Sequence, residues 1–382
     1  MDGTKVESRE SCQDSPESDS AQPLFACRST YFWPAELTVN AKNQIFESVL
    51  TQWPFDRWAE FTVLVAVSGG ADSVCLVRVL NDLFRRRPDS RGHIELLYVD
   101  HGIREDSALE AKFVQNLADE QNLLAHFESV GSQAGTNRGQ GLEALLRARR
   151  YEAYENIAEQ IGARYVVTAH HLDDQVETIL HRLFRGTGVT GLRGIPASRK
   201  INESLTVVRP FLGIRKQEIL DCLEEYGQSF CRDETNFETQ FTRNKIRNQL
   251  LPDLREMFGD QVEQALLRLS ESAHEMDEFL GSAAESVQQA FAVTPQKIVV
   301  DKHKCHDVDS FLIRRRLYAC WEQAGFSRQD MTRQKWLDAV EAIIGESTAR
   351  EKEVTVFQLP GGVFVNSGER YVTFDLNRDC PT

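Results

Sequence analysis

Apolar residues between positions 61 and 170 come in short runs, and the segments between these runs have the apolar period of a helix. The runs predict four buried strands: FTVLVAV (61–67), HIELLYVD (93–100), LLAHFESV (123–130) and ARYVVTAH (163–170). Helices are predicted between them, at 72–86, 107–122 and 141–162. This alternation predicts an α/β fold with a doubly wound parallel sheet, whose ligands bind at the carboxyl ends of the strands.

The apolar pattern changes after residue 210, where the period becomes helical for a long stretch. Helices are predicted there at 213–227, 242–258 and 260–291. Beyond them, a strand at 297–301, two further helices and a terminal hairpin predict a small mixed module. We therefore expect four parts: a tail at 1–36, an α/β domain at 37–230, a helical region at 231–293 and a small α+β C-terminal module at 294–382.

The chain is acidic, with 58 Asp and Glu residues against 44 Lys and Arg residues and a net charge of -14. Residues 1–36 are polar and lack an apolar period, which predicts a disordered acidic tail. An acidic chain does not coat nucleic acid with its whole surface, so an RNA partner requires a local basic surface. Such a surface is expected between Arg138 and Lys216, where 13 basic residues stand against eight acidic ones.

Composition and cysteine spacing exclude several classes of protein. No window reaches the roughly 18 apolar residues of a membrane span, and the N-terminus has no apolar segment of a secretory signal. The eight cysteines form no CxxC pair, so neither a disulfide framework nor a zinc ribbon is indicated. With 41% hydrophobic and 27% charged residues, the chain has the composition of a globular enzyme, and we expect a cytoplasmic protein with no membrane partner.

The segment AVSGGADS (66–73) lies between the first predicted strand and the first predicted helix. Two glycines allow close approach of the backbone to an anion, and the following helix contributes its positive N-terminal end. The alternative is a glycine-rich turn that only closes a strand-helix unit. The phosphate-binding residues predicted by this segment are Ser68, Gly69, Gly70, Ala71, Asp72 and Ser73. A Walker A motif has Lys before its last residue, but here Asp72 stands there, and its carboxylate suits Mg²⁺.

The segment HHLDDQVET (170–178) follows the fourth predicted strand and concentrates acidic residues at the start of a helix. Asp174 and Glu177 are three residues apart and share one face of that helix. The alternative for Asp173 is a helix cap with solvated acids behind it.

Two groups of arginines are candidates for contact with phosphates. Arg147 and Arg150 are three residues apart on a long predicted helix, and Arg243 and Arg247 belong to the cluster FTRNKIRN. An arginine fork suits phosphate anions. For each group the alternative is a solvated basic face.

The SGGxDS pattern at 68–73 resembles the pyrophosphate loop of the N-type ATP pyrophosphatases. Together with the loop, further motifs that recur in order from about Phe61 to Pro252 closely resemble the tRNA(Ile)-lysidine synthetase family. These motifs are VDHGIRED (99–106), GLEALLRARRY (141–151), TAHHLDDQVETILHRLFRGTGVTGLRGIP (168–196), RPFLGIRKQEI (209–219) and CRDETNFETQFTRNKIRNQLLP (231–252).

The resemblance implies an adenine-nucleotide alpha hydrolase-like fold and an ATP-dependent ligase that uses ATP and Mg²⁺. It implies that L-lysine is joined to C2 of the wobble cytidine (position 34) of tRNA(Ile) with a CAU anticodon, through an adenylated cytidine. Lysidine then changes codon reading from AUG to AUA.

The resemblance also assigns roles to residues and regions. It makes 37–230 the ATP-binding catalytic domain and 231–293 a tRNA-contacting region, and it suggests a monomer or a homodimer. The implied catalytic residues are Asp72, His170, Asp174, Glu177 and Arg150. ATP is assigned to the loop at 68–73, tRNA to Arg147, Arg243 and Arg247, and Mg²⁺ to Asp72. The alternative function is a tRNA thiolating enzyme with the same loop, but such relatives usually need catalytic cysteines or a cluster held by CxxC, and the chain has no CxxC.

Overall fold

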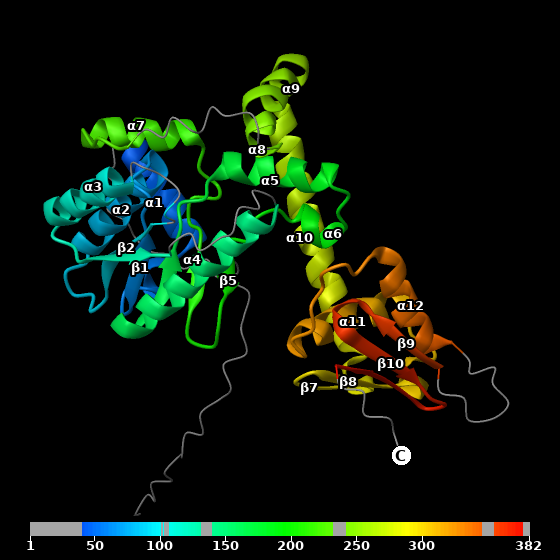
Figure 1. Ribbon diagram of the computed structural model, residues 1–382. Coiled ribbons are helices and arrows are strands. Elements are labelled where there is room, and N and C mark those ends of the chain that lie inside the picture. The colour runs from blue at the N-terminus through cyan, green and yellow to red at the C-terminus, as the bar shows by residue number, and fades with distance from the viewer. Residues whose placement is uncertain are drawn as a thin grey trace, which may run out of the picture. The chain divides into compact units, whose positions relative to one another are not determined.

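The computed structural model describes residues 40–100, 102, 107–130, 140–231, 242–345 and 355–376 (Figure 1). The predicted tail at 1–36 and parts of the motifs at 99–106 and 231–252 lie outside the described residues. The chain divides into two units, which are Met1–Asp173 with Ala197–Glu234, and Asp174–Pro196 with Thr235–Thr382.

The first unit is built on a six-stranded sheet with the order β3-β2-β1-β4-β6-β5. Its strands are β1 (Thr62–Ala66), β2 (His93–Asp100), β3 (Ala125–Ser129), β4 (Ala163–Val167), β5 (Ser198–Lys200) and β6 (Thr206–Val208). Neighbouring strands are parallel except β5, which runs antiparallel to β6. The predicted parallel α/β sheet is therefore confirmed, and the carboxyl ends of β1, β4 and β6 meet at one edge.

Helices of the first unit cover both faces of the sheet. They are α1 (Ala41–Gln52), α2 (Ala71–Arg85), α3 (Ser107–Gln121), α4 (Gln140–Ile161) and α7 (Lys216–Tyr226). Because side chains alternate along a strand, Val63 and Val65 of β1 join a core with α1, α2, α3 and α7, while Leu64 joins a second core with α4. Burial on both faces explains why β1 is a continuous apolar run. The sequence pattern did not predict α1.

The second unit contains a helical part and a small α+β module. Its helical elements are the main part of α5 (Leu172–Phe184), α6 (Val189–Leu192), α8 (Thr242–Lys245), a π-helical segment η3 (Ile246–Leu250), α9 (Leu251–Phe258) and α10 (Gln261–Glu285). The module has an antiparallel sheet of the order β7-β8-β11-β10-β9. Its elements are β7 (Phe291–Thr294), β8 (Lys297–Asp301), α11 (Ser310–Gln323), α12 (Arg333–Ile344), β9 (Thr355–Leu359), β10 (Val363–Ser367) and β11 (Tyr371–Asp375).

One predicted boundary in the second unit is wrong. The helix expected at 260–291 ends at Glu285, and Phe291 begins strand β7, where it pairs with Val300 of β8. Phe291 is buried in the core of the small module, so pairing and burial outweigh the helical period of the preceding residues. The terminal hairpin is confirmed as β9 to β11, and the strands β7 and β8 extend it to five strands.

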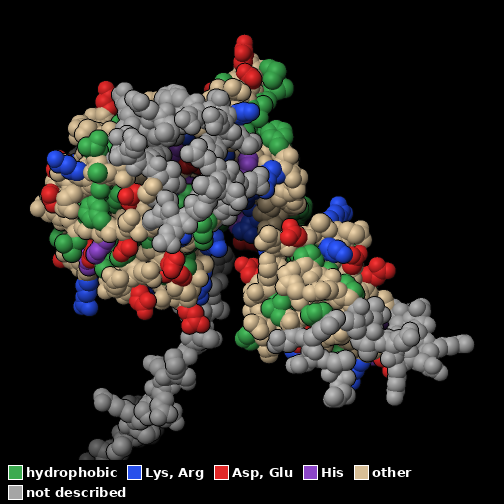
Figure 2. All heavy atoms as spheres, viewed as in Figure 1, with side chains coloured by type: hydrophobic (Ala, Val, Ile, Leu, Met, Phe, Trp, Pro, Cys, Tyr) green, Lys and Arg blue, Asp and Glu red, His purple; other side chains and the backbone are tan. Residues whose placement is uncertain are grey.

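Charged side chains of both signs are interspersed on the face of the protein drawn in Figure 2. Within the described residues, no helix is long and apolar enough to cross a membrane.

Candidate active site

The predicted phosphate loop connects β1 to α2 at the carboxyl edge of the parallel sheet. Gly69 has a φ of 83°, a conformation that favours glycine. A Cβ at this position would lie 3.3 Å from the Cys231 sulfur, and the Cys231 amide donates a 2.9 Å hydrogen bond to the Gly69 carbonyl. Gly69 thus has the left-handed backbone that the motif requires, and Cys231 fills the side on which its Cβ would stand.

Two serines brace the loop from within. The Ser73 hydroxyl donates to the Gly70 carbonyl over 3.0 Å and accepts a hydrogen bond from the Ser68 amide over 3.2 Å. Ser73 and Ala71 are buried, whereas Ser68 is exposed. The first amides of a helix have no intrahelical acceptor. Gly70, which precedes α2, has no side chain that could accept a hydrogen bond from them. This end of α2 suits an anion.

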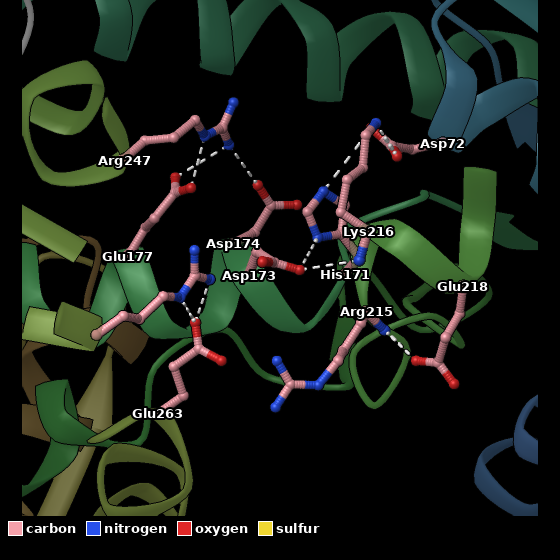
Figure 3. A network of polar contacts seen from close by, with 11 residues as sticks. Asp72, His171, Asp173, Asp174, Glu177, Arg215, Lys216, Glu218, Arg247 and Glu263 are labelled. Carbon is pink, nitrogen blue, oxygen red and sulfur yellow. Dashed lines mark hydrogen bonds and ion pairs between the residues drawn. The ribbon is translucent and has the colours of Figure 1, made fainter. Parts of the chain in front are cut away.

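Asp72 lies in the first turn of α2 and contacts groups from the neighbouring strand-helix connections. Its Oδ1 is 2.5 Å from the Lys216 Nζ, and its Oδ2 is 3.8 Å from the His171 Nε2 (Figure 3). Asp173 accepts a 2.9 Å hydrogen bond from the Lys216 amide and lies 3.4 Å from the His171 Nδ1. The structure therefore assembles two acids, one lysine and one histidine beside the loop.

The two histidines of HHLDDQVET have different surroundings. His171 is buried at 4% exposure and faces both aspartates of this group. His170, which the sequence singled out, is half-buried, and its Nδ1 lies 3.0 Å from the Thr168 hydroxyl.

Asp174 and Glu177 share one face of α5, as predicted, and both contact Arg247 in the second unit. The Arg247 Nε donates to Glu177 over 2.6 Å, and its Nη2 donates to Glu177 over 3.0 Å and to Asp174 over 3.2 Å (Figure 3). The side chain of Glu177 is 6% exposed and that of Arg247 is 40% exposed. A bidentate, charge-assisted pair of this kind fixes the orientation of a carboxylate. Arg247 belongs to the π-helical segment η3, a type of irregularity that is frequent at functional sites.

The remaining predicted arginines lie on helices of different units. Arg147, on α4, is exposed and donates to the Tyr151 hydroxyl over 3.2 Å. Arg150 is half-buried on the same helix. Burial raises the pKa of Tyr154 to about 12, and the charge of Arg150 acts against this rise. Arg243 is exposed on α8.

Sequence reasoning assigned no site role to Lys216 or His171. Lys216 begins α7, which follows the parallel strand β6, and such helix starts gather at the ligand edge of the sheet. Because β6 was not predicted from the sequence, this signal was missed. No comparable signal separated His171 from His170.

Fold and loop together define a protein with a PP-loop domain. Residues 42–254, more than half of the chain, match the family described as "PP-loop domain". A tRNA(Ile)-lysidine synthase of Rhodopirellula baltica is 30% identical over 332 residues, which cover 77% of this chain and 83% of the relative. A tRNA(Ile)-lysidine synthase of Symbiobacterium thermophilum is 41% identical over 232 residues, which cover 60% of this chain and 46% of the relative. The chain belongs to the tRNA(Ile)-lysidine synthase family and is thus an ATP-using ligase.

A comparison with solved structures supports the fold alone. The U34-tRNA thiolase NcsA from Methanococcus maripaludis, with its [4Fe-4S] cluster, has a TM-score of 0.52 at 14% identity, over 62% of this chain and 80% of that chain. The adenine-nucleotide alpha hydrolase-like fold predicted from the sequence is confirmed.

Proposed function

We propose that the protein joins L-lysine to C2 of cytidine 34 in the CAU anticodon of tRNA(Ile), with ATP as the activating co-substrate. The observation that carries this proposal is the braced SGGADS loop at the carboxyl edge of the sheet, in a chain of the tRNA(Ile)-lysidine synthase family. The product is lysidine, which changes codon reading from AUG to AUA.

In the first step, the C2 oxygen of the cytosine attacks the α-phosphorus of ATP, and pyrophosphate leaves. The amides at the start of α2 and the hydroxyl of Ser68 bind the departing pyrophosphate, because unsatisfied donors and the positive helix end stabilise developing negative charge. Gly69 keeps the loop in its left-handed turn, a backbone conformation that a residue with a Cβ would strain. We propose that Arg150 and His170 also act in this step, Arg150 on phosphate charge and His170 on charge or proton transfer.

Mg²⁺ fits the residues present. Asp72 offers a carboxylate beside the loop, and its side chain is 30% exposed. Mg²⁺ is usually held by one or two carboxylates together with phosphates of the substrate, so a single carboxylate at this place is sufficient from the protein. When bound to Asp72, the ion would supply positive charge that neutralises phosphate oxygens.

In the second step, the ε-amine of lysine attacks the activated C2, and AMP leaves. Asp174 and Glu177 suit a substrate that carries two amines, because both carboxylates are acceptors for ammonium groups. Arg247 holds both acids, and we propose that it orients them for lysine. Of the arginines predicted to contact tRNA, Arg147 and Arg243 are exposed and can bind its phosphates. The guanidinium of Arg247 already binds Asp174 and Glu177, so it would have to bind tRNA in addition to these two acids.

The proposal is tested by incubating the full chain with ATP, Mg²⁺, radiolabelled lysine and a transcript of tRNA(Ile) with a CAU anticodon. We expect label in the tRNA, with one AMP and one pyrophosphate released for each lysine joined. A transcript with uridine at position 34 is the matched control and should gain no label. Parallel reactions contain a sulfur donor in place of lysine. Sulfur incorporation without lysine incorporation would contradict the proposal and favour the thiolating alternative.

A further inference from the structure

Lys216 lies beside the phosphate loop at the carboxyl edge of the parallel sheet. It is the first residue of α7, which follows β6 of the parallel sheet. Its amide is held by Asp173 over 2.9 Å, and its Nζ reaches Asp72 over 2.5 Å. The side chain remains 39% exposed. The ammonium group therefore lies at the first turn of α2, beside the loop, and is accessible.

The loop itself lacks a lysine. In the Walker A motif, a lysine directly before the last Ser or Thr reaches the β- and γ-phosphates, but in this loop Asp72 stands directly before Ser73. The Asp72–Lys216 contact brings an ammonium group to the same residue from a different strand-helix connection, 144 positions later in the sequence. The chain thus has at this place the positive charge that the loop sequence does not supply.

The carboxylates beside the loop would repel a polyphosphate unless a cation neutralises them. Asp72 and Asp173 both lie at this edge of the sheet, and Lys216 contacts both of them, one through Nζ and one through its amide. A polyphosphate that approaches the amides of α2 meets the negative charge of Asp72 within the first turn. An ammonium group has three donors on a flexible stem, so Lys216 can turn a donor toward a phosphate oxygen.

We propose that Lys216 is a catalytic residue that binds the β- and γ-phosphates of ATP and then the released pyrophosphate. Without nucleotide, it neutralises Asp72. This inference rests on the proposed use of the loop as the ATP site. It predicts that Lys216 contributes to binding of pyrophosphate but not to binding of AMP, which lacks the two outer phosphates.

The test compares Lys216→Met and Lys216→Arg with the wild-type full chain by isothermal titration with ATP, inorganic pyrophosphate and AMP, each with Mg²⁺. Loss of a charge-assisted hydrogen bond should weaken ATP and pyrophosphate binding by about tenfold or more, and AMP binding should stay within about twofold. Lys216→Arg should retain most of the affinity because it keeps the charge. Lys112→Met, at an exposed lysine of α3, is the matched control and should bind all three like wild type.

A purely structural role for Lys216 is separated by the Asp72→Asn background. There the carboxylate that Lys216 neutralises is absent, so a lysine that only supports Asp72 has nothing left to contribute. If the change to Met still weakens pyrophosphate binding in that background, Lys216 contacts the phosphate. The double variant also leaves no unpaired carboxylate at position 72, so it tests the proposal even if Lys216→Met alone fails to fold.

Unchanged pyrophosphate affinity in both backgrounds, or an equal loss for AMP, would overturn the inference. Its failure can be told apart from failure of the proposed function, because lysine incorporation is measured separately. A wild-type chain that joins lysine to tRNA while Lys216→Met binds pyrophosphate normally would remove only the inference. A chain whose pyrophosphate binding depends on Lys216 but which joins no lysine would remove only the proposed function.

Discussion

Replacement of Gly69 by alanine tests whether the shape of the loop serves nucleotide binding. Two effects oppose a side chain there. The φ of 83° is a left-handed conformation that costs an L-residue about 1–2 kcal/mol. The new Cβ would also lie 3.3 Å from the Cys231 sulfur and 3.6 Å from Phe113, so neighbours must shift. We expect a loss of unfolding free energy of about 1–2 kcal/mol from the backbone alone, together with a clear loss of ATP affinity.

Gly227 provides the matched control for this change. It ends α7 with a φ of 61°, and a Cβ there would meet nothing within 4 Å. Gly227→Ala should therefore lose about the same unfolding free energy through its backbone and keep its ATP affinity. Unfolding in urea and titration with ATP measure the two properties separately.

The contact of Gly69 with Cys231 can be tested in the same series. Cys231→Ala removes the sulfur but keeps the amide that donates to the Gly69 carbonyl. In the Gly69→Ala background it should restore part of the lost ATP affinity, while the backbone cost remains. Normal ATP affinity in Gly69→Ala alone would refute the reasoning, since the loop would then tolerate a displaced backbone.

Two further predictions concern the second unit. Asp277 is 3% exposed and is contacted by Arg193, Arg315 and Thr190. Burial raises its pKa, but the hydrogen bonds from these three partners outweigh burial and lower the pKa below the usual value. Asp277→Asn should therefore lose about 3 kcal/mol of unfolding free energy at pH 7. The difference from wild type in urea unfolding should shrink as the pH falls below about 4, through the lowered pKa, and an undiminished difference there would contradict the assignment. Glu177→Gln should weaken lysine use by about tenfold or more and affect adenylation less. Single-turnover measurements separate the two steps, and an equal loss in both would place Glu177 with the nucleotide.

The elements that the sequence predicted well are those in which a single segment carries the whole signal. Strand β1 is such a case, because burial on both faces makes every residue of its centre apolar. Helix α1 was not predicted, since it buries only a short stripe that includes Ile45, Phe46 and Val49. The same limit applies to the site. The loop motif is contiguous and was therefore recognised. The contact between Asp72 and Lys216 joins residues 144 positions apart, and the pattern of apolar residues within a short segment cannot predict such a contact.

The acidic doublet of HHLDDQVET shows why neighbouring residues in a motif need not share a role. Successive residues of an α-helix point about 100° apart, whereas residues three apart lie on one face. Asp173 accordingly accepts a hydrogen bond from the amide of Lys216, whereas Asp174 and Glu177 both accept hydrogen bonds from Arg247. Asp173 thus accepts the first amide of α7 and faces His171, and it takes no part in the contacts of Arg247 that the structure shows for Asp174 and Glu177. We therefore expect a substitution of Asp173 to disturb the start of α7 at Lys216. A substitution of Asp174 should instead disturb the two carboxylates that Arg247 binds, so these neighbouring aspartates have different roles.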